Sequence, residues 1–209
     1  LDGKGHPRYR ICEGVAWDYI PLTRPLKALA RKVDAVCFGS LAQRNADSRA
    51  TLQAFVRASR ADALRIFDIN LRQAFYSRDI VETSLKLCTV LKLSEDEHPV
   101  LARMFGLSGG LERQLEQLRR AFCLRLIACT RGSKGSLLLT AHTCSTHGGY
   151  PVEVVDCVGA GDSFTAALCM GLLKKRSLKA IGRHANRVGA FVCGQAGATP
   201  VLPPELRTV

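Results

Sequence analysis

The chain has 209 residues, enough for one α/β domain with a sizeable core, and its 47% hydrophobic and 23% charged residues are ordinary for a globular protein. No apolar run approaches the roughly 18 residues of a membrane span, and the N-terminus shows no basic stretch followed by an apolar run and a small-residue cleavage site, so we expect a cytoplasmic protein. The net charge of +12 would permit nucleic-acid binding, but the basic residues are scattered and no aromatic residues interleave with them, which disfavours that class.

The first 32 residues are irregular, with Pro7, Pro21 and Pro25 and one short strand expected at 8–12. From residue 33 onward, apolar runs of strand length alternate with amphipathic segments of helical period. We expect strands at 33–38, 64–69, 89–93 and 124–129, and helices at 48–60, 77–87, 95–105 and 111–122. This alternation predicts a mostly parallel sheet with helices on both faces, joined by right-handed crossovers.

The pattern changes after residue 130. Two hairpin-like strands are expected at 135–140 and 150–155, followed by a helix at 163–174. A last helix is expected from the apolar stripe over 180–192. The sequence contains no internal repeat and no low-complexity linker.

The nine cysteines form no Cys-x-x-Cys pair, and several, such as Cys37 and Cys129, lie inside apolar strand runs. We therefore expect reduced and mostly buried thiols rather than disulfides. One cluster has plausible ligand chemistry, His142, Cys144 and His147, but its spacing matches no common zinc pattern. We assign no metal to it.

A glycine turn at 159–161 lies between an apolar segment and a helix. Because they lack Cβ atoms, Gly159 and Gly161 let backbone N–H groups converge on an anion, and the helix N-terminus adds its positive end. Asp162 comes next and would repel a phosphate. Its presence suggests a chemical task, taking the proton of a hydroxyl that attacks a phosphoryl group. The alternative is that Asp162 only caps the helix.

The segment 156–164, Asp-Cys-Val-Gly-Ala-Gly-Asp-Ser-Phe, resembles the C-terminal signature of the PfkB (ribokinase-like) carbohydrate kinases. Further segments are similar to motifs of that family and follow its order along the chain: 67–72, 91–97, 130–135, 185–186 and 197–200. The likeness covers residues 33–203 and implies an α/β, ribokinase-like three-layer fold. The family's N-terminal Gly-Gly-x-x-x-Asn sugar motif has no match here. We therefore expect an N-terminally truncated chain, with 1–32 as a remnant of the lid and substrate region and 33–209 as the kinase core.

The resemblance also implies a site at the carboxyl ends of the strands, where open α/β sheets bind ligands. The implied cofactors are ATP and Mg²⁺, with K⁺ as a further option at a loop that Asp156 organises. The implied roles are Asp162 as base with Gly159, Ala160 and Gly161 as anion hole; Thr130, Gly132, Gly135, Asn186 and Gly197 for the nucleotide; Asp68, Asn70 and Arg72 for substrate or phosphate; and Glu97 and Asp156 for metal.

Some of these roles have structural alternatives. Asp68 and Arg72 have the charges and spacing of an ion pair at a loop base, and Ser94 with Glu97 has the spacing of a helix capping box. Ser94 also stands where the family has Asn, which leaves the magnesium role mainly to Glu97. Cys157 replaces the family's Thr, a change that leaves the glycine amides in place.

We expect ATP-dependent phosphorylation of a sugar hydroxyl, with a hexose such as fructose favoured because the segment 13–18 resembles that of fructokinase-like members. The second hypothesis is a catalytically degenerate kinase homologue that binds nucleotide and regulates or scaffolds a partner. It is favoured by Ser94 and by the unmatched N-terminal motif. A basic nucleic-acid-binding protein is the third. We expect no membrane partner and leave a homodimer of the longer protein open.

Overall fold

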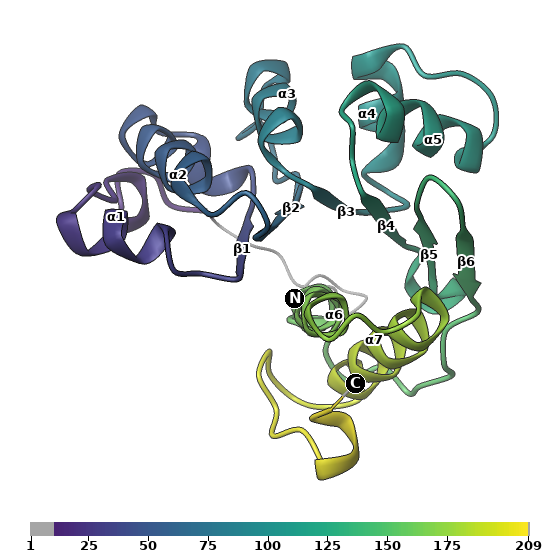
Figure 1. The fold of residues 1–209 in the computed structure, drawn as a ribbon. Helices are drawn as coiled ribbons and strands as arrows, with labels where there is room; N and C mark the ends of the chain where they lie inside the picture. Colours follow the sequence, from purple (N-terminus) through teal and green to yellow (C-terminus); the bar gives the residue numbers. More distant parts are fainter. Residues whose placement is uncertain (1–10, 209) are drawn as a thin grey trace.

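The computed structural model describes residues 11–208, which form a single six-stranded sheet with helices on both faces (Figure 1). The strands lie in the order β1-β2-β3-β4-β5-β6. The first four run parallel: β1 (Ala35–Phe38), β2 (Leu64–Asp68), β3 (Val90–Ser94) and β4 (Leu126–Thr130). The last two are antiparallel: β5 (Ser136–Leu139) and β6 (Cys144–His147).

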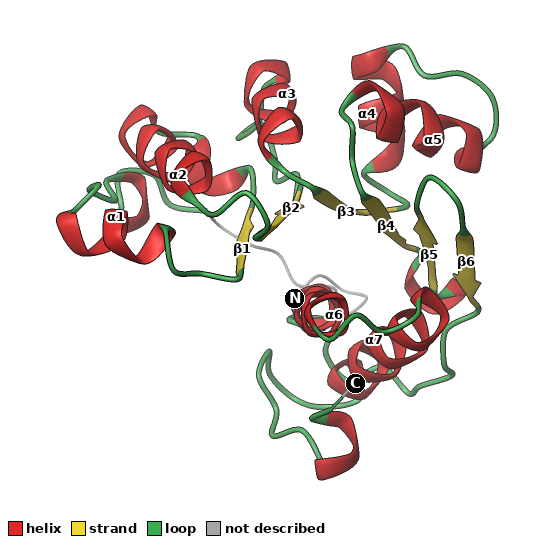
Figure 2. Ribbon diagram, in the orientation of Figure 1, coloured by secondary structure: helices red, strands yellow, loops and turns green. Residues whose placement is uncertain are grey.

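Helices cover the two faces of the sheet unequally, as Figure 2 shows. One face carries α2 (Ala46–Ala58), α3 (Arg78–Leu87), α4 (His98–Phe105) and α5 (Leu111–Ala121), and α1 (Arg24–Ala30) lies beside α2. The other face carries α6 (Ala160–Leu173) and α7 (Leu178–Cys193). This arrangement confirms the predicted three-layer α/β class. No helix within residues 11–208 is both long and apolar enough to cross a bilayer.

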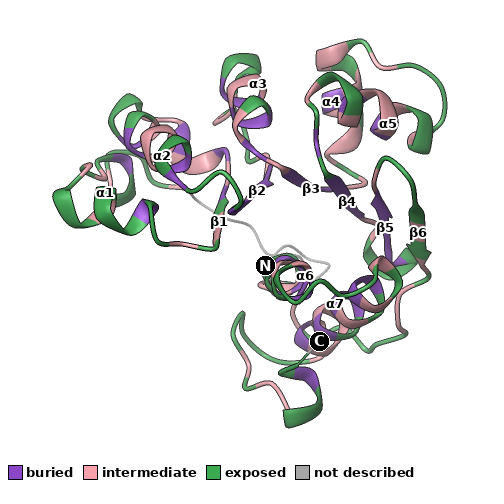
Figure 3. Ribbon diagram, in the orientation of Figure 1, coloured by how far each residue is buried: buried purple, intermediate pink, exposed green. Residues whose placement is uncertain are grey.

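Two hydrophobic clusters, one on each side of the sheet, hold the layers together. Successive residues of β2 show the alternation of a buried strand, because Phe67 packs into one cluster and Ile66 into the other. Both are 0% exposed. Strands β2 to β5 are accordingly the most continuously buried part of the ribbon in Figure 3, whereas β6 is exposed or half-buried. The first cluster includes Leu85, Leu91, Leu101, Leu115 and Ile127, and the second includes Leu138, Leu168, Ile181 and Ala185.

The parallel strands and their helices lie within a few residues of their predicted bounds, but the predicted hairpin was wrong in its second strand. That strand is Cys144–His147, not 150–155. A turn closed by Thr140 leads into it: the Thr140 hydroxyl accepts the Thr143 N–H at 3.1 Å. Residues 150–155 include three valines but belong to no strand, and Val154 and Val155 are 58% and 61% exposed.

Three smaller expectations also need correction or lie outside the described residues. The helix after the glycine turn begins at Ala160 instead of residue 163. The thiols are not mostly buried: all nine cysteines are free, but only Cys88 and Cys129 are buried, and Cys37 in β1 is exposed. The strand expected at 8–12 begins outside the described residues, and residues 11 and 12 are in no strand.

Candidate active site

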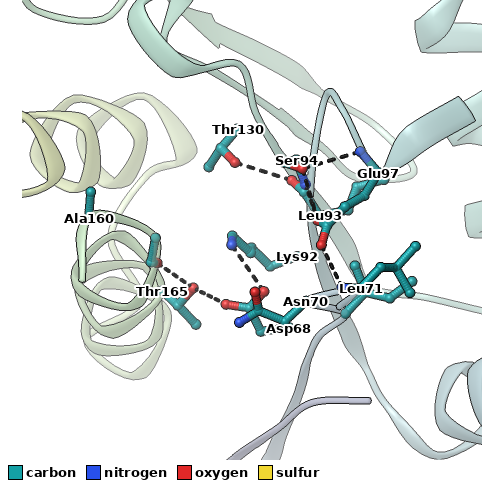
Figure 4. A network of polar contacts seen from close by, with 12 residues as sticks. Asp68, Asn70, Leu71, Lys92, Leu93, Ser94, Glu97, Thr130, Ala160 and Thr165 are labelled. Carbon is teal, nitrogen blue, oxygen red and sulfur yellow. Dashed lines mark hydrogen bonds and ion pairs between the residues drawn. The ribbon is translucent and has the colours of Figure 1, made fainter. Parts of the chain in front are cut away.

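The candidate site lies where the carboxyl ends of β2, β3 and β4 meet the N-terminus of α6. Asp68, Ser94 and Thr130 are the last residues of these three strands. Figure 4 shows their side chains beside the first turns of α6, which carries Ala160 and Thr165. The sequence therefore predicted correctly which strand ends come together, as expected for ligand sites of open α/β sheets.

The glycine turn has a geometry that requires glycine at its first position. Gly159 is the N-cap of α6 and has φ +83°, and a Cβ on it would overlap the carbonyl oxygen of Ala198. The amides of Gly161 and Asp162 belong to the first turn of the helix. Backbone N–H groups in this turn have no carbonyl acceptor within the helix. With the positive end of the 14-residue α6, they form a site suited to an anion.

Two cavities flank this turn. One, of about 690 Å³, is lined by most of the residues predicted to bind nucleotide, namely Thr130, Gly132, Gly135 and Asn186, together with Ala160 and Gly161. The other, of about 510 Å³, is lined by Asp68, Asn70, Asp162 and Thr165. The first turn of α6 therefore separates a space lined by the predicted nucleotide residues from a space lined by the predicted base.

Gly197 and Asp156 lie at the edge of this arrangement. Gly197 is not among the residues that line the 690 Å³ cavity, and its N–H donates to Asp156 Oδ2 at 3.3 Å. Asp156 Oδ1 accepts the Val158 N–H at 2.9 Å. Asp156 thus connects the approach to the glycine turn with the loop after α7, and both of its carboxylate oxygens already accept a hydrogen bond.

A buried ion pair that the sequence analysis missed lies under the turn. Lys92 Nζ is 3.0 Å from Asp68 Oδ1, and both side chains are 7% exposed. The Thr165 hydroxyl oxygen lies 2.9 Å from both Asp68 Oδ2 and the Gly161 carbonyl oxygen, and its single proton is donated to one of these acceptors at a time. Burial raises the pKa of the Asp68 carboxyl, while Lys92 and Thr165 oppose that increase. The structural alternative of an Asp68–Arg72 ion pair is wrong, because Asp68 pairs with Lys92 instead.

Lys92 also lies close to the anion turn itself. A Cβ built on Gly161 would be 3.3 Å from Lys92 Nζ. A lysine inside the apolar run of β3 was a signal that sequence reasoning could have used, since an unpaired buried lysine is rare in a strand. Its partner, however, lies on a different strand and could not be read from the sequence.

Glu97 is held by its own surroundings. Its carboxylate accepts the N–H of Leu71 at 2.8 Å, and the N–H and hydroxyl of Ser94 at 2.7 and 3.0 Å. The Glu97 N–H donates in turn to Ser94 Oγ at 3.2 Å. These reciprocal bonds have the pattern of a capping box, but they close the turn between β3 and α4, because α4 begins at His98 with Glu97 as its N-cap. Among residues 11–208 no three His, Cys, Asp or Glu side chains gather as metal ligands, and the metal role of Glu97 stays a prediction.

Asn70 and Arg72 lie beyond the end of β2 on the opposite side from the nucleotide cavity. Asn70 adopts φ +45°, a left-handed conformation that asparagine tolerates better than most residues. Ser40 Oγ holds this corner by donating to the Ile69 carbonyl oxygen at 2.6 Å. Both Asn70 and Arg72 line a third cavity of about 220 Å³ next to Trp17.

Fold and site together define an α/β protein of ribokinase-like architecture with a phosphate-type anion turn. The sequence profile of the pfkB family carbohydrate kinases matches residues 17–205, and the chain belongs to that family. PH1459, a sugar kinase of Pyrococcus horikoshii described as uncharacterized, is 30% identical over 200 residues, which cover 92% of this chain and 60% of that protein. Fructokinase-2 of Zea mays is 28% identical, over 84% of this chain and 55% of its own length.

Solved structures agree with this assignment. PH1459 in complex with ATP superposes with a TM-score of 0.75 at 28% identity, over 93% of this chain and 63% of that chain. Fructokinase from Vibrio cholerae with bound fructose, ADP and calcium superposes with a TM-score of 0.68 at 27% identity, over 78% of this chain and 56% of that one. The chain thus spans between about half and two thirds of the length of the relatives it matches.

Proposed function

We propose that the protein to which this chain belongs transfers the γ-phosphoryl group of ATP to a sugar hydroxyl. The observation that carries the proposal is the position of the first turn of α6 between two cavities, with Gly161 lining one and Asp162 the other. A phosphoryl group bound at the turn can then face a nucleotide on one side and an acceptor hydroxyl on the other. Positioning and charge stabilisation supply most of the rate in such a transfer.

The chemical step assigned to this chain is a proton transfer. Asp162 takes the proton of the acceptor hydroxyl while that oxygen forms its bond to the γ-phosphorus. The bond from the γ-phosphorus to the β–γ bridging oxygen breaks, and ADP leaves with the electron pair. The amides of Gly161 and Asp162 stabilise the charge on the transferring group, whereas the predicted Ala160 amide already donates to the Cys157 carbonyl oxygen at 3.3 Å. The proposal places the nucleotide against Thr130 and Asn186.

We propose that Glu97 would hold Mg²⁺ through the acceptor capacity left on its carboxylate, which already accepts three hydrogen bonds from Leu71 and Ser94. The ion would neutralise charge on the transferring phosphate, and we derive no step through it. For Asp156 we propose that it organises the loop around Gly197, where its carboxylate accepts the Gly197 N–H. A K⁺ ion at this loop stays a prediction.

Fructose is the proposed acceptor. It is supported by the several fructokinases among the relatives and by the Vibrio cholerae fructokinase structure with bound fructose. Within this chain, Asn70 and Arg72 are the proposed contacts for sugar or phosphate, because they line the space beside the cavity that holds Asp162. We place residues 1–32 in the substrate region and residues 33–209 in the kinase core. A cytoplasmic location, where ATP is available, belongs to the same proposal.

The test is ADP release by the full protein, measured with fructose, glucose, ribose and aminoimidazole riboside as separate acceptors. Saturable release with fructose, and a lower kcat/KM with the others, is the expected result. Magnesium-dependent ATP binding without phosphorylation of any sugar would favour the catalytically degenerate homologue instead. Salt-sensitive binding of DNA or RNA without ATP dependence would favour the nucleic-acid-binding protein.

A further inference from the structure

Two cysteines from distant parts of the chain meet in the wall of the 690 Å³ cavity. Cys157 lies just before the glycine turn, and Cys193 is the last residue of α7. The Cys193 carbonyl oxygen accepts the N–H groups of Val155 and Asp156 at 2.9 and 3.1 Å. These two bonds hold the backbone before Cys157 directly against the end of α7.

The two thiols are also in contact. Burial, and after it the neighbouring Cys157 thiol, raise the pKa of the Cys193 thiol, as expected when the two side chains lie close together. Cys157 is exposed, whereas Cys193 is half-buried. A disulfide needs Cα atoms about 4.4–6.8 Å apart and side chains that face each other. Cys157 and Cys193 line one cavity and lie on two segments that backbone hydrogen bonds already join, so we infer that a disulfide can close between them.

The other cysteines lack this combination of contact and access. Burial raises the pKa of Cys88 and of Cys129 to about 12, so both thiols are inert near neutral pH. Cys37 and Cys169 share the 510 Å³ cavity, but no backbone hydrogen bond within residues 11–208 joins the segments that carry them. Cys37 therefore provides a matched control outside the nucleotide cavity.

We propose that Cys157 and Cys193 form a modifiable dithiol in the wall of the candidate nucleotide cavity, which low-molecular-weight disulfides oxidise to an intramolecular disulfide. The exposed Cys157 thiolate attacks one sulfur of the reagent, which forms a mixed disulfide and releases one thiolate. The Cys193 thiolate then attacks the Cys157 sulfur, which closes the protein disulfide and releases the second thiolate. The two protons lost by the protein end on the released thiols, so the protein is oxidised and the reagent is reduced to two thiols.

Because Cys157 lines the cavity wall, we expect a nucleotide bound in the cavity to cover its thiol and to hinder the reagent. This part of the inference rests on the proposed function. If ATP and the reagent compete for the same space, ATP at about ten times its Kd slows oxidation about tenfold.

The experiment treats the full chain, as its gene encodes it, with oxidised glutathione after complete reduction, and maps the products by peptide mass spectrometry. The expected product lacks two hydrogen atoms and links the Cys157 and Cys193 peptides, and dithiothreitol reverses it. Cys193→Ala has no resolving thiol and should stop at a glutathione adduct on Cys157. Cys37→Ser should oxidise like the parent. Circular dichroism confirms that each variant is folded.

Two outcomes separate this inference from the proposed function. A persistent glutathione adduct on Cys157 in the parent, or a cross-link between another pair of cysteines, overturns the dithiol whatever ATP does. If the Cys157–Cys193 disulfide forms at the same rate with and without ATP, the dithiol stands and the shielding of Cys157 by a bound nucleotide is refuted.

Discussion

Replacing Lys92 by Met tests the buried ion pair under the anion turn. Methionine keeps most of the volume of the side chain but leaves the Asp68 carboxylate buried without its cation. Both partners are only 7% exposed. Removing one partner of such a pair costs about 3–5 kcal/mol. In a domain of this size each kcal/mol shifts the melting temperature by about 2–4 °C, so we expect Lys92→Met to melt roughly 6–20 °C below the parent.

The effect should depend on pH with a definite sign. The pKa of Asp68 is already raised above its ordinary value of 3.8 by burial, and loss of Lys92 raises it further. A raised pKa in the folded state means that stability is greatest below the unfolded pKa and is lost as pH rises through the folded pKa. The difference between Lys92→Met and the parent should therefore be larger at pH 8 than at pH 5.

Urea denaturation followed by circular dichroism, at both pH values, measures these differences. The double variant Asp68→Asn with Lys92→Met removes both charges and should be more stable than Lys92→Met alone, which reveals the coupling. Lys86→Met is the control, because Lys86 pairs with Glu82 on the surface of α3, and its loss should cost at most about 1 kcal/mol. A Lys92→Met protein within about 0.5 kcal/mol of the parent, or a double variant as unstable as the single one, would refute the reasoning.

Three further predictions concern the proposed base, the anion turn and a surface ion pair. Asp162→Asn should lower kcat by about 100-fold or more with little change in ATP affinity, since it removes only the proton acceptor; near-normal turnover contradicts that role. Gly161→Val should lower activity more than Gly110→Val. A Cβ on Gly161 comes within 3.3 Å of Lys92 Nζ, whereas a Cβ on Gly110 meets nothing within 4 Å. Equal activities of the two variants would mean that the glycine turn has no special role in phosphate binding. Hydrogen bonds from Arg119 and Arg120 lower the pKa of Glu116 from 4.5 to about 2. Glu116→Gln should therefore unfold at a slightly lower urea concentration than the parent at pH 7. This difference between the variant and the parent should vanish as the pH falls from 4.5 through 2.

The parallel half of the fold could be predicted because its strands are buried on both faces and appear as continuous apolar runs. The antiparallel edge could not, because β6 reads Cys-Ser-Thr-His and alternates between exposed and half-buried positions. The segment 150–155 has the β-branched residues of a strand, yet the N–H of Val155 bonds to the end of α7 instead of a sheet edge. Local propensity and tertiary position disagree at this point, and tertiary position decides.

The candidate site shows the same division between local and long-range information. The positions of Asp68, Thr130 and the glycine turn followed from strand ends and a contiguous motif, both of which are local in sequence. The Lys92–Asp68 pair and the contact between Cys157 and Cys193 join separate elements, and nothing in the spacing of these residues indicates them. The Ser94–Glu97 capping box was visible as a spacing, but the bond from Leu71 to Glu97 was not.

The anion turn depends on three attachments that come from different parts of the chain. Thr165 and Asp68 join α6 to β2, Asp156 joins the approach to the turn to Gly197, and Gly159 fits closely against Ala198. Each attachment forms only when α6 and α7 have packed on the sheet. A variant at Asp68 or Lys92 therefore changes folding and phosphate binding together. Asp162 is exposed and takes part in none of these contacts, so its substitution separates chemistry from stability and is the stricter test of the proposed mechanism.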